Sequence, residues 1–464
     1  MITYPKLYYI KCIGLKIIIR ALIVNIVLGY GGVISCNNTE LVEVPEESPV
    51  EERTKTLVHD GAWCWFSDPR AIYYSEDEII SGWVKRNGSI EVVNFNLISE
   101  TKKLNTIYPK MQIDDHNNPA FTVLPNANIF TMYAWHGGKN GVVSNTTSNG
   151  SDIFSFSNNT VFKPKTDLLL EAFPHESYTY ANPYVLRGEN NKLFSFGRWI
   201  GFKPNLIISE DNGLSWSGQY VIVSRKPFDA GNRPYAKYFS DGNTKIHMVF
   251  TDGHPRNEYL NSVYYCYYEN GAFWKADGNK ISDLSELPME PQDASVVYRP
   301  DVNSGRAWIC DIVEKDGTPF ILYTRHPQET DHRYHYARYI SATNKWEDHE
   351  ICKAGKWFPQ TQPTKTEREP HYMGNMTFNP NKPNEIYVSR EVNGIFEIQK
   401  YITKDGGVSW DIIPVTENSV YDNVRPYVPR YQPENAKTIV LWMENKKYIH
   451  YTDFDVRIKY FIDE

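Results

Sequence analysis

Short apolar runs separated by turn residues recur along the chain from about residue 57 onward. The stretch 114–137, DDHNNPAFTVLPNANIFTMYAWHG, contains two such runs joined by the turn Pro-Asn-Ala-Asn. Alternation of apolar and polar positions is typical of half-buried β-strands, and a short loop between two alternating runs predicts a hairpin. No long amphipathic helix stands out, so the pattern predicts an all-β protein.

These hairpins form a repeat. A proline lies just ahead of a strand-like run in segments that start at Ser67, Asn117, Ala181, Asn232 and Val424, with two weaker members near Ala307 and Pro370. Seven units in about 400 residues match the size of propeller blades, which are roughly 40 to 50 residues long. We therefore expect residues 57–464 to form a seven-bladed β-propeller of four-stranded antiparallel blades.

Two segments, SEDNGLSW from Ser209 and TKDGGVSW from Thr403, follow the Asp-box pattern S/T-x-D-x-G-x-x-W. In this pattern the aspartate and glycine close a tight turn between outer strands, while the tryptophan packs between sheets. We expect both boxes to be structural and assign them no chemistry.

The N-terminal segment has the features of an export signal. Basic residues precede an apolar run at 21–28, and small residues then lead to Ile34-Ser35-Cys36. The run is too short for a membrane helix, which needs roughly 20 apolar residues. Residues 1–35 are therefore predicted to be a lipoprotein signal peptide, Cys36 the lipidated residue and 36–56 an acidic flexible tether. We expect lipid anchoring in the outer membrane or at the cell surface, with a periplasmic or secreted protein as alternatives.

The charge and the cysteines exclude other classes of protein. The formal net charge is −7, and residues 1–35 contribute +4, so the exported part carries −11. Nucleic acid is therefore an unsuitable partner. Cys64, Cys266, Cys310 and Cys352 show no CxxC pairing and are expected to be buried thiols.

The hairpin geometry predicts which polar residues meet. In a propeller blade, the residue just before the first strand and the residue just after the second emerge at the same mouth of the central channel. His116 and His136 are symmetric about Asn126, and Tyr180 and Arg198 are symmetric about Glu189. The same argument brings further residues to this mouth: Lys85, Arg233, His254, His371, Arg390 and Arg425. Such a ring of basic groups predicts an anionic ligand.

The residues at this mouth suit one reaction. No pair of carboxylates has the placement of a glycosidase acid and base, and no serine or cysteine has a nucleophile elbow. Histidine, tyrosine and arginine together suit β-elimination on a uronic acid, in which Arg198 neutralises the carboxylate. His116 and Tyr180 would then be the base and acid, in an order the spacing leaves open, and His136 would orient the substrate or bind its carboxylate.

Several segments carry a family resemblance. DGAWCWFSDPRAIYY, DDHNNPAF with its trailing WHG, YTYANPYVL with FGRW, and NRPYAKY with TDGHP resemble BNR-repeat propeller proteins, which include the ulvan lyases of polysaccharide lyase families 24 and 25. The resemblance runs from about Val58 to the C-terminus and is closer to family 25. It implies cleavage of ulvan, a polymer of 3-sulfated rhamnose and uronic acid, at the 4-position of the uronate, which leaves an unsaturated sugar.

The resemblance also implies roles for individual residues. His116, His136, Tyr180 and Arg198 match the family's active-site residues, with Tyr184 as a fallback for Tyr180. Tyr235 is the expected second active-site tyrosine, ahead of Tyr238. The residues of the basic ring that are expected to bind substrate are Lys85, Arg233, His371, Arg390 and Arg425. No cofactor is expected in catalysis, and the protein is expected to be a monomer.

A structural zinc site is also implied by the resemblance. His254 and Cys266 match two of its ligands. The further histidine of the family is replaced here by Tyr268, so that His332 or His335 would have to complete a four-ligand site.

Two alternatives remain open from the sequence. A sialidase-type exo-glycosidase would share the fold, but it needs an arginine triad and a paired tyrosine and glutamate. A non-catalytic surface lipoprotein could use the basic ring only to hold polyanionic glycans. Endo or exo action and the preference for glucuronate or iduronate are also left open.

Overall fold

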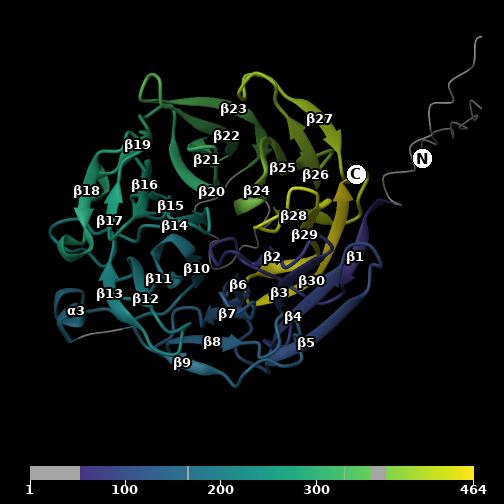
Figure 1. The fold of residues 1–464 in the computed structure, drawn as a ribbon. Coiled ribbons are helices and arrows are strands. Elements are labelled where there is room, and N and C mark those ends of the chain that lie inside the picture. Colours follow the sequence, from purple (N-terminus) through teal and green to yellow (C-terminus); the bar gives the residue numbers. More distant parts are fainter. Residues whose placement is uncertain (1–52, 165–166, 329, 357–371, 464) are drawn as a thin grey trace, which may run out of the picture. The chain divides into compact units, whose positions relative to one another are not determined.

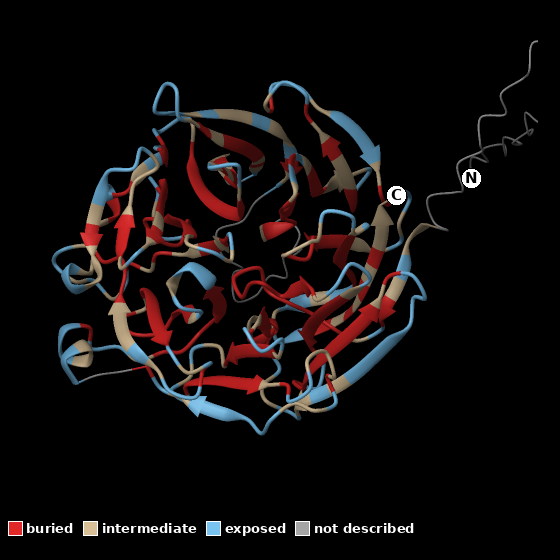
Figure 2. Cartoon of the chain, in the orientation of Figure 1, coloured by how far each residue is buried: buried red, intermediate tan, exposed pale blue. Residues whose placement is uncertain are grey.

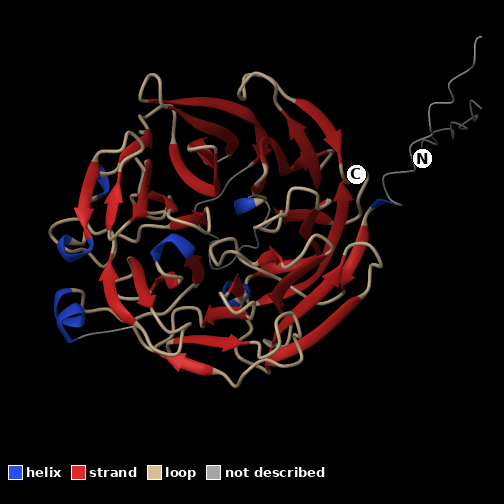
Figure 3. Ribbon diagram, in the orientation of Figure 1, coloured by secondary structure: helices blue, strands red, loops and turns tan. Residues whose placement is uncertain are grey.

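The computed structural model describes residues 53–164, 167–328, 330–356 and 372–463. Within them the regular structure is almost entirely β-strand, and Figure 3 shows only short helices between the strands. The predicted signal peptide 1–35, Cys36, most of the tether 36–56 and His371 lie outside the described residues. No helix within the described ranges is long and apolar enough to cross a membrane.

Seven antiparallel sheets surround a central axis (Figure 1), which confirms the predicted seven-bladed β-propeller. Blade 1 consists of β2 (Ala71–Tyr73), β3 (Glu78–Val84), β4 (Ile90–Asn96) and β5 (Lys102–Tyr108). Blade 2 consists of β6 (Ala120–Val123), β7 (Ile129–Ala134), β8 (Val142–Thr146) and β9 (Thr160–Phe162). Blade 3 consists of β10 (Asn182–Leu186), β11 (Lys192–Arg198), β12 (Pro204–Ser209) and β13 (Ser217–Val221).

Blade 4 departs from the four-stranded expectation, because its sheet has six strands. These are β14 (Ala236–Ser240), β15 (Ile246–Thr251), β16 (Val263–Glu269), β17 (Ala272–Trp274), β18 (Lys280–Asp283) and β19 (Ser295–Tyr298). Blade 5 consists of β20 (Arg306–Lys315), β21 (Thr318–Gln328), β22 (Asp331–Ile340) and β23 (Lys345–Gly355). Blade 6 consists of β24 (Met376–Asn379), β25 (Lys382–Val392), β26 (Ile395–Ile402) and β27 (Asp411–Pro414).

The last blade combines strands from both ends of the propeller segment. It consists of β28 (Asp422–Tyr427), β29 (Thr438–His450), β30 (Asp453–Asp463) and β1 (Lys55–Val58). Strand β1 therefore begins inside the predicted tether, and its register pairs Lys55 with Tyr460 and Val58 with Ile458. This pairing closes the ring.

The helical elements are short. Those whose bounds fall within the described residues are the α-helix α3 (Asp167–Ala172) and the 3-10 turns η1 (Asp115–Asn117), η2 (Arg187–Glu189), η3 (Leu284–Glu286) and η4 (Pro291–Asp293). Two of the turns, η1 and η2, lie at opposite ends of first strands, and both carry residues that matter below.

Burial falls from the inside of each blade to its outer edge. Figure 2 shows buried inner strands and largely exposed outer strands, among them β5, β9 and β27. The core is divided among the interfaces between neighbouring blades, as where the Phe196 ring of blade 3 stacks on the Tyr238 ring of blade 4 at 4.4 Å. Stacked blades thus bury apolar faces that a single blade would expose.

Both Asp boxes have the predicted structural role. Asp211 accepts the backbone N–H of Ser215 at 2.8 Å and so closes the turn between β12 and β13. The Trp216 ring then lies 6.2 Å from the Phe130 ring of blade 2. The box at 403–410 repeats this turn between β26 and β27.

Buried ion pairs join distant blades around the axis. Each pairs a carboxylate from one blade with a cation from another: Asp68 with Lys237, Asp115 with Arg425 at 2.6 Å, and Asp311 with Arg430 at 2.5 Å. All six side chains are almost completely buried. A buried charge is costly unless it is paired and hydrogen-bonded, so each pair depends on both partners being in place.

Removing Asp311 is expected to destabilise the propeller by about 3–5 kcal/mol. Asp311→Ala leaves the Arg430 guanidinium buried without its carboxylate, and it removes the acceptor for the Thr377 hydroxyl and the Phe378 amide, both at 3.0 Å. Urea unfolding followed by tryptophan fluorescence measures the change. Asp411→Ala, which breaks an exposed pair with Lys404, serves as the control and should leave the midpoint almost unchanged. Equal midpoints for the two variants would contradict this interpretation.

Candidate active site

The two histidines that bracket the blade 2 hairpin meet as predicted. His116 lies in η1, just before β6, and His136 lies just after β7. Their imidazole rings stack with centroids 3.9 Å apart and planes inclined by 14°. The start of the first strand and the end of the second strand of this blade therefore lie at the same mouth of the channel, which we call the histidine mouth.

One carboxylate holds both rings. Asp114 accepts a hydrogen bond from Nδ1 of His116 through Oδ1 and from Nδ1 of His136 through Oδ2, each at 2.7 Å. Asp114 also caps η1 by accepting the backbone N–H of His116 at 3.0 Å. Because Nδ1–H of each ring is used by the carboxylate, Nε2 is the nitrogen left to exchange a proton with a ligand.

The environment separates the charge states of the two rings. Burial and the positive charge of His116 lower the pKa of His136 to about 4, despite its bond to Asp114. Burial opposes charge on His116 as well, but Cys64, Asp114 and Asp115 raise the pKa of His116 well above its ordinary value. Since burial also raises the pKa of the Cys64 thiol and keeps it neutral, we attribute the effect to the two carboxylates. We therefore expect the two rings to differ in charge at neutral pH, with His116 as the imidazolium and His136 as the neutral imidazole.

Tyr180 and Arg198 reach the same mouth from blade 3. The Tyr180 ring lies 5.9 Å from that of His116, and the Arg198 guanidinium lies 5.2 Å from the centre of the Tyr180 ring. Burial raises the pKa of Tyr180 well above the ordinary phenol value, so its hydroxyl stays protonated. Tyr180 also has a φ of +65°, a conformation that is rare for a bulky residue and is found more often at functional sites.

Arg198 is a buried cation without a carboxylate partner. It is 8% exposed, and none of the described residues forms an ion pair with it. Its Nε and Nη1 are buried and make no hydrogen bond within the described part of the chain. The guanidinium lies instead over aromatic rings, including that of Tyr235 at 4.7 Å. This is the arrangement expected of a group that receives an anion from outside.

The expected second tyrosine, Tyr235, is at the site. Its ring lies 6.4 Å from that of Tyr180 and, with Phe66, lines a small cavity beside Arg198. The alternative Tyr238 lines the same cavity but also packs in the core between blades 3 and 4. Tyr184 lies in that core, where its hydroxyl donates to the carbonyl of Tyr238.

Sequence reasoning missed two residues of the site. Asp114 holds both histidines, and the Tyr451 ring lies edge-on to them, 4.8 Å from His116 and 5.2 Å from His136. Tyr451 occupies the turn between β29 and β30. Turns between second and third strands face this same mouth, so extending the hairpin argument by one strand would have found it.

The remaining members of the basic ring are placed differently. Arg425 is not a substrate-binding residue, because it is 1% exposed and its Nη1 donates to Asp115 and to the carbonyl of Trp63. Lys85 is paired with Glu91 at 3.0 Å. For Lys85 a role in binding stays a prediction.

Two more arginines of the ring differ in their distance from Arg198. Arg233 lies over the Phe202 ring at 4.0 Å and near enough to Arg198 for repulsion to contribute, after burial, to a lowered pKa of Arg233. Arg390 lies beside Cys352 of β23, the outermost strand of blade 5, and so away from the inner strands. Substrate binding by Arg233 and Arg390 stays a prediction.

The proposed zinc ligands do not fit a shared site. Cys266 lies in β16, is paired with Met248 of β15 and packs in the core between blades 3 and 4. His254 follows β15, stacks near Trp308 at 4.6 Å and bonds to the Tyr372 hydroxyl at 2.5 Å. The loop that carries His254 contacts Ser262, whose backbone N–H donates to Asp252. Cys266 lies four residues farther along the chain, which in a strand is roughly 13 Å from Ser262.

Of the two substitutes for the missing zinc ligand, His335 bonds to Asp348 at 3.1 Å. The His332 ring lies 4.8 Å from that of His326, and a role for His332 as a metal ligand stays a prediction. Among the described residues, no group of three metal-ligating side chains includes His254 or Cys266.

Two other clusters bring potential metal ligands within 4.8 Å of one another: Asp114 with His116 and His136, and Cys64 with Asp115 and His116. Both have another explanation. Asp114 accepts N–H from the two imidazoles, and Asp115 is neutralised by Arg425. These contacts already satisfy the carboxylates without a metal.

The chain matches one family model. The model described as a BNR repeat-containing family member matches residues 80–354, more than half of the chain. No curated protein matches the sequence.

Solved structures share the fold. A polysaccharide lyase PL25 ulvan lyase bound to -[GlcA(1-4)Rha3S]- superposes with a TM-score of 0.63 at 13% identity, over 87% of this chain and 94% of that one. The polysaccharide lyase Uly1 superposes with a TM-score of 0.53 at 12% identity, over 88% of this chain and 97% of that one. These likenesses establish the shared propeller.

Between about pH 5 and 7, where an unperturbed histidine titrates, we expect His136 to stay neutral and His116 to stay protonated. Titration of the imidazole resonances by NMR measures both. Asp114→Asn removes the shared negative charge, so the pKa of His116 should fall towards its ordinary value.

Asp60→Asn is the matched control, because Asp60 accepts the backbone N–H of Arg86 rather than that of an imidazole. It should leave both titrations unchanged. If both wild-type rings titrated together with ordinary values, the charge separation would be wrong.

Proposed function

The chain belongs to the BNR repeat-containing family, and from that premise we propose that it is a polysaccharide lyase that cleaves ulvan by β-elimination at the uronate. Two of the solved structures that share its propeller are PL25 ulvan lyases, one of them bound to -[GlcA(1-4)Rha3S]-. The substrate named for that protein contains the carboxylate and the sulfate that a cationic mouth attracts.

The observation that carries the proposal is the buried guanidinium of Arg198, which has no carboxylate partner among the described residues, beside a histidine pair and a protonated tyrosine. A uronate carboxylate placed on Arg198 would satisfy its buried N–H groups and form a strong charge-assisted contact. Neutralisation of that carboxylate makes the C5 proton more acidic and stabilises the enolate that forms when it leaves.

The charge states expected for the site favour one order of proton transfers. The neutral ring of His136 accepts the C5 proton at Nε2, the C5–H electrons form the C4=C5 double bond, and the C4–O4 bond breaks. Tyr180 donates its hydroxyl proton to O4. His116, as an imidazolium, adds positive charge next to the developing enolate. This assignment exchanges the roles of the two histidines that the sequence had suggested.

Binding of the substrate would strengthen the base. The charge of Arg198 contributes to the low pKa of His136, after burial and His116. A carboxylate on Arg198 cancels that contribution and moves the pKa of His136 upward, towards the range in which a general base works best.

We also propose that the chain is exported and anchored by lipid at Cys36, on the basis of the residue pattern at 6–36. This would place the enzyme where large polysaccharides are accessible. Expressed in its native host, Cys36→Ser is expected to move the protein from the membrane fraction to the soluble fraction, as followed by fractionation and immunoblotting. A wild-type protein found only in the soluble fraction would contradict the anchoring.

Incubation with ulvan should produce the ultraviolet absorbance of a conjugated uronate and new reducing ends in equal amounts. Arg198→Ala and Tyr180→Phe should each lower the turnover number by at least about 100-fold, since each removes a group that acts in the transition state. Circular dichroism and thermal unfolding would verify that both variants fold. Lys404→Ala, which changes an exposed Asp-box residue, is the control and should retain full activity.

The same assay separates the alternatives. Reducing ends without the absorbance would show hydrolysis, as in a sialidase-type enzyme. Retention on immobilised ulvan without any cleavage would identify a glycan-binding protein. Either outcome would overturn the lyase proposal.

A further inference from the structure

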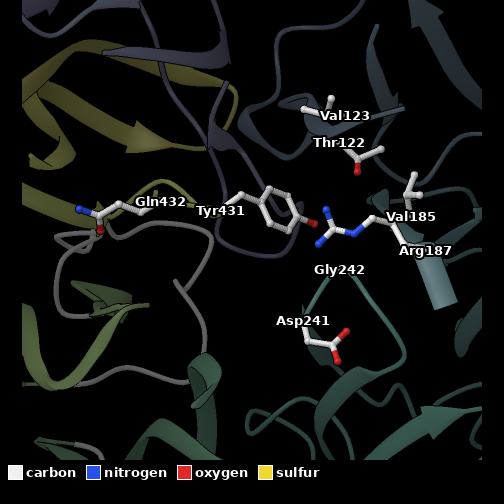
Figure 4. Close-up of a pocket in the computed structure, with 8 residues that line it drawn as sticks. All are labelled: Thr122, Val123, Val185, Arg187, Asp241, Gly242, Tyr431 and Gln432. Carbon is white, nitrogen blue, oxygen red and sulfur yellow. The ribbon is translucent and has the colours of Figure 1, made fainter. Parts of the chain in front are cut away.

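A second cavity lies at the opposite end of the hairpins from the histidine mouth (Figure 4). It has a volume of about 400 Å³ and is lined by Thr122, Val123, Val185, Arg187, Asp241, Gly242, Tyr431 and Gln432. This volume is in the range of small-molecule binding sites. We call it the far-mouth cavity.

Its position follows from the same hairpin geometry that builds the active site. Arg187 lies in η2, which joins β10 to β11, and Gly242 lies in the turn that joins β14 to β15. These turns are at the far ends of the strands whose near ends carry Tyr180, Arg198 and Tyr235. The far-mouth cavity therefore shares no residue with the histidine mouth.

Polar groups from three blades converge in this cavity. Figure 4 shows the Tyr431 ring with its hydroxyl directed towards the Arg187 guanidinium, and the Thr122 hydroxyl beside them. Thr122 comes from blade 2, Arg187 from blade 3 and Tyr431 from the loop after β28 in blade 7. Burial raises the pKa of the Tyr431 phenol, so the phenol stays protonated and can donate a hydrogen bond.

The one carboxylate in the lining does not neutralise Arg187. Asp241 Oδ1 accepts the backbone N–H groups of Asn243, Thr244 and Lys245 at 2.7, 2.9 and 3.1 Å. Figure 4 accordingly shows its carboxylate apart from the guanidinium. Within the described part of the chain, Arg187 has no ion pair.

The rest of the lining suits a sugar. Val123 and Val185 provide an apolar wall against which the C–H face of a sugar ring can pack, and Val185 is 7% exposed. The Tyr431 ring and the Gln432 amide supply groups of the kind that bind hydroxyls.

We propose that the far-mouth cavity is a second saccharide site, which binds one acidic sugar unit by placing its carboxylate or sulfate on Arg187. A guanidinium binds either anion through two parallel hydrogen bonds. The choice of a sugar as the bearer of the anion rests on the proposed function, whereas the anion site itself does not. Such a site holds a chain end or a released product away from the reacting sugar.

Isothermal titration of the full chain with three probes tests the proposal: glucuronate, rhamnose 3-sulfate and inorganic sulfate. The titrations use Arg198→Ala as the background, so that binding at the histidine mouth is suppressed and no turnover is needed. We expect one of the two sugars to bind this background. Adding Arg187→Gln should weaken that binding at least about tenfold, since it removes a charged hydrogen-bond donor. Arg299→Gln, at an exposed arginine outside the cavity, is the matched control and should leave it unchanged.

Each outcome decides the matter. Binding of glucuronate or of rhamnose 3-sulfate identifies the carboxylate or the sulfate as the recognised group. Equal affinity for rhamnose 3-sulfate and inorganic sulfate would overturn the sugar assignment. Absence of binding by all probes, or binding unaffected by Arg187→Gln, would overturn the site. A failure of lyase activity with Arg187-dependent binding intact would reject only the proposed function.

Discussion

Strand β1 closes the ring of blades, and this closure holds the other six blades and both mouths in place. A chain of blades that ended at β30 would expose the edge of β30, with unpaired N–H and C=O groups. Strand β1 covers that edge and fixes the last blade next to the first. With the ring closed, all seven first strands face one axis, and the loops at their ends are confined to two opposite mouths. The active-site candidates gather because the topology leaves them no other place.

Charge is distributed unevenly within this ring. Along the axis, cations and carboxylates from different blades are paired and buried, as with Arg425 and Asp115. Such pairs contribute little net stability compared with apolar packing, but they impose a strict arrangement, because an unpaired member is strongly destabilising. Arg198 is the exception beside the histidines, since its charge has no carboxylate partner among the described residues. That imbalance distinguishes a binding group from a structural one.

The histidine pair shows how a single carboxylate produces two different groups. Asp114 bonds equally to both rings, but their pKa values differ. Burial and then the positive charges of His116 and Arg198 lower the pKa of His136, whereas His116 has an additional contact with Asp115. Two identical side chains can therefore act as a charge-stabilising cation and a neutral base in one reaction. The difference lies entirely in what surrounds each ring.

The residue pattern alone predicts the seven repeats, both Asp-box turns and the meeting of His116 with His136 and of Tyr180 with Arg198. All of these follow from local rules: a strand alternates with period two, and a hairpin brings residues equidistant from its turn together. Which charges are satisfied became known from the three-dimensional fold. Arg198 ends β11 and Arg425 lies within β28, but Arg425 meets Asp115 from 310 positions away and is buried as a structural cation. Tyr451, the separation of His254 from Cys266 and the far-mouth cavity were likewise decided there, because each depends on distances between blades, and no periodicity within a hairpin encodes them.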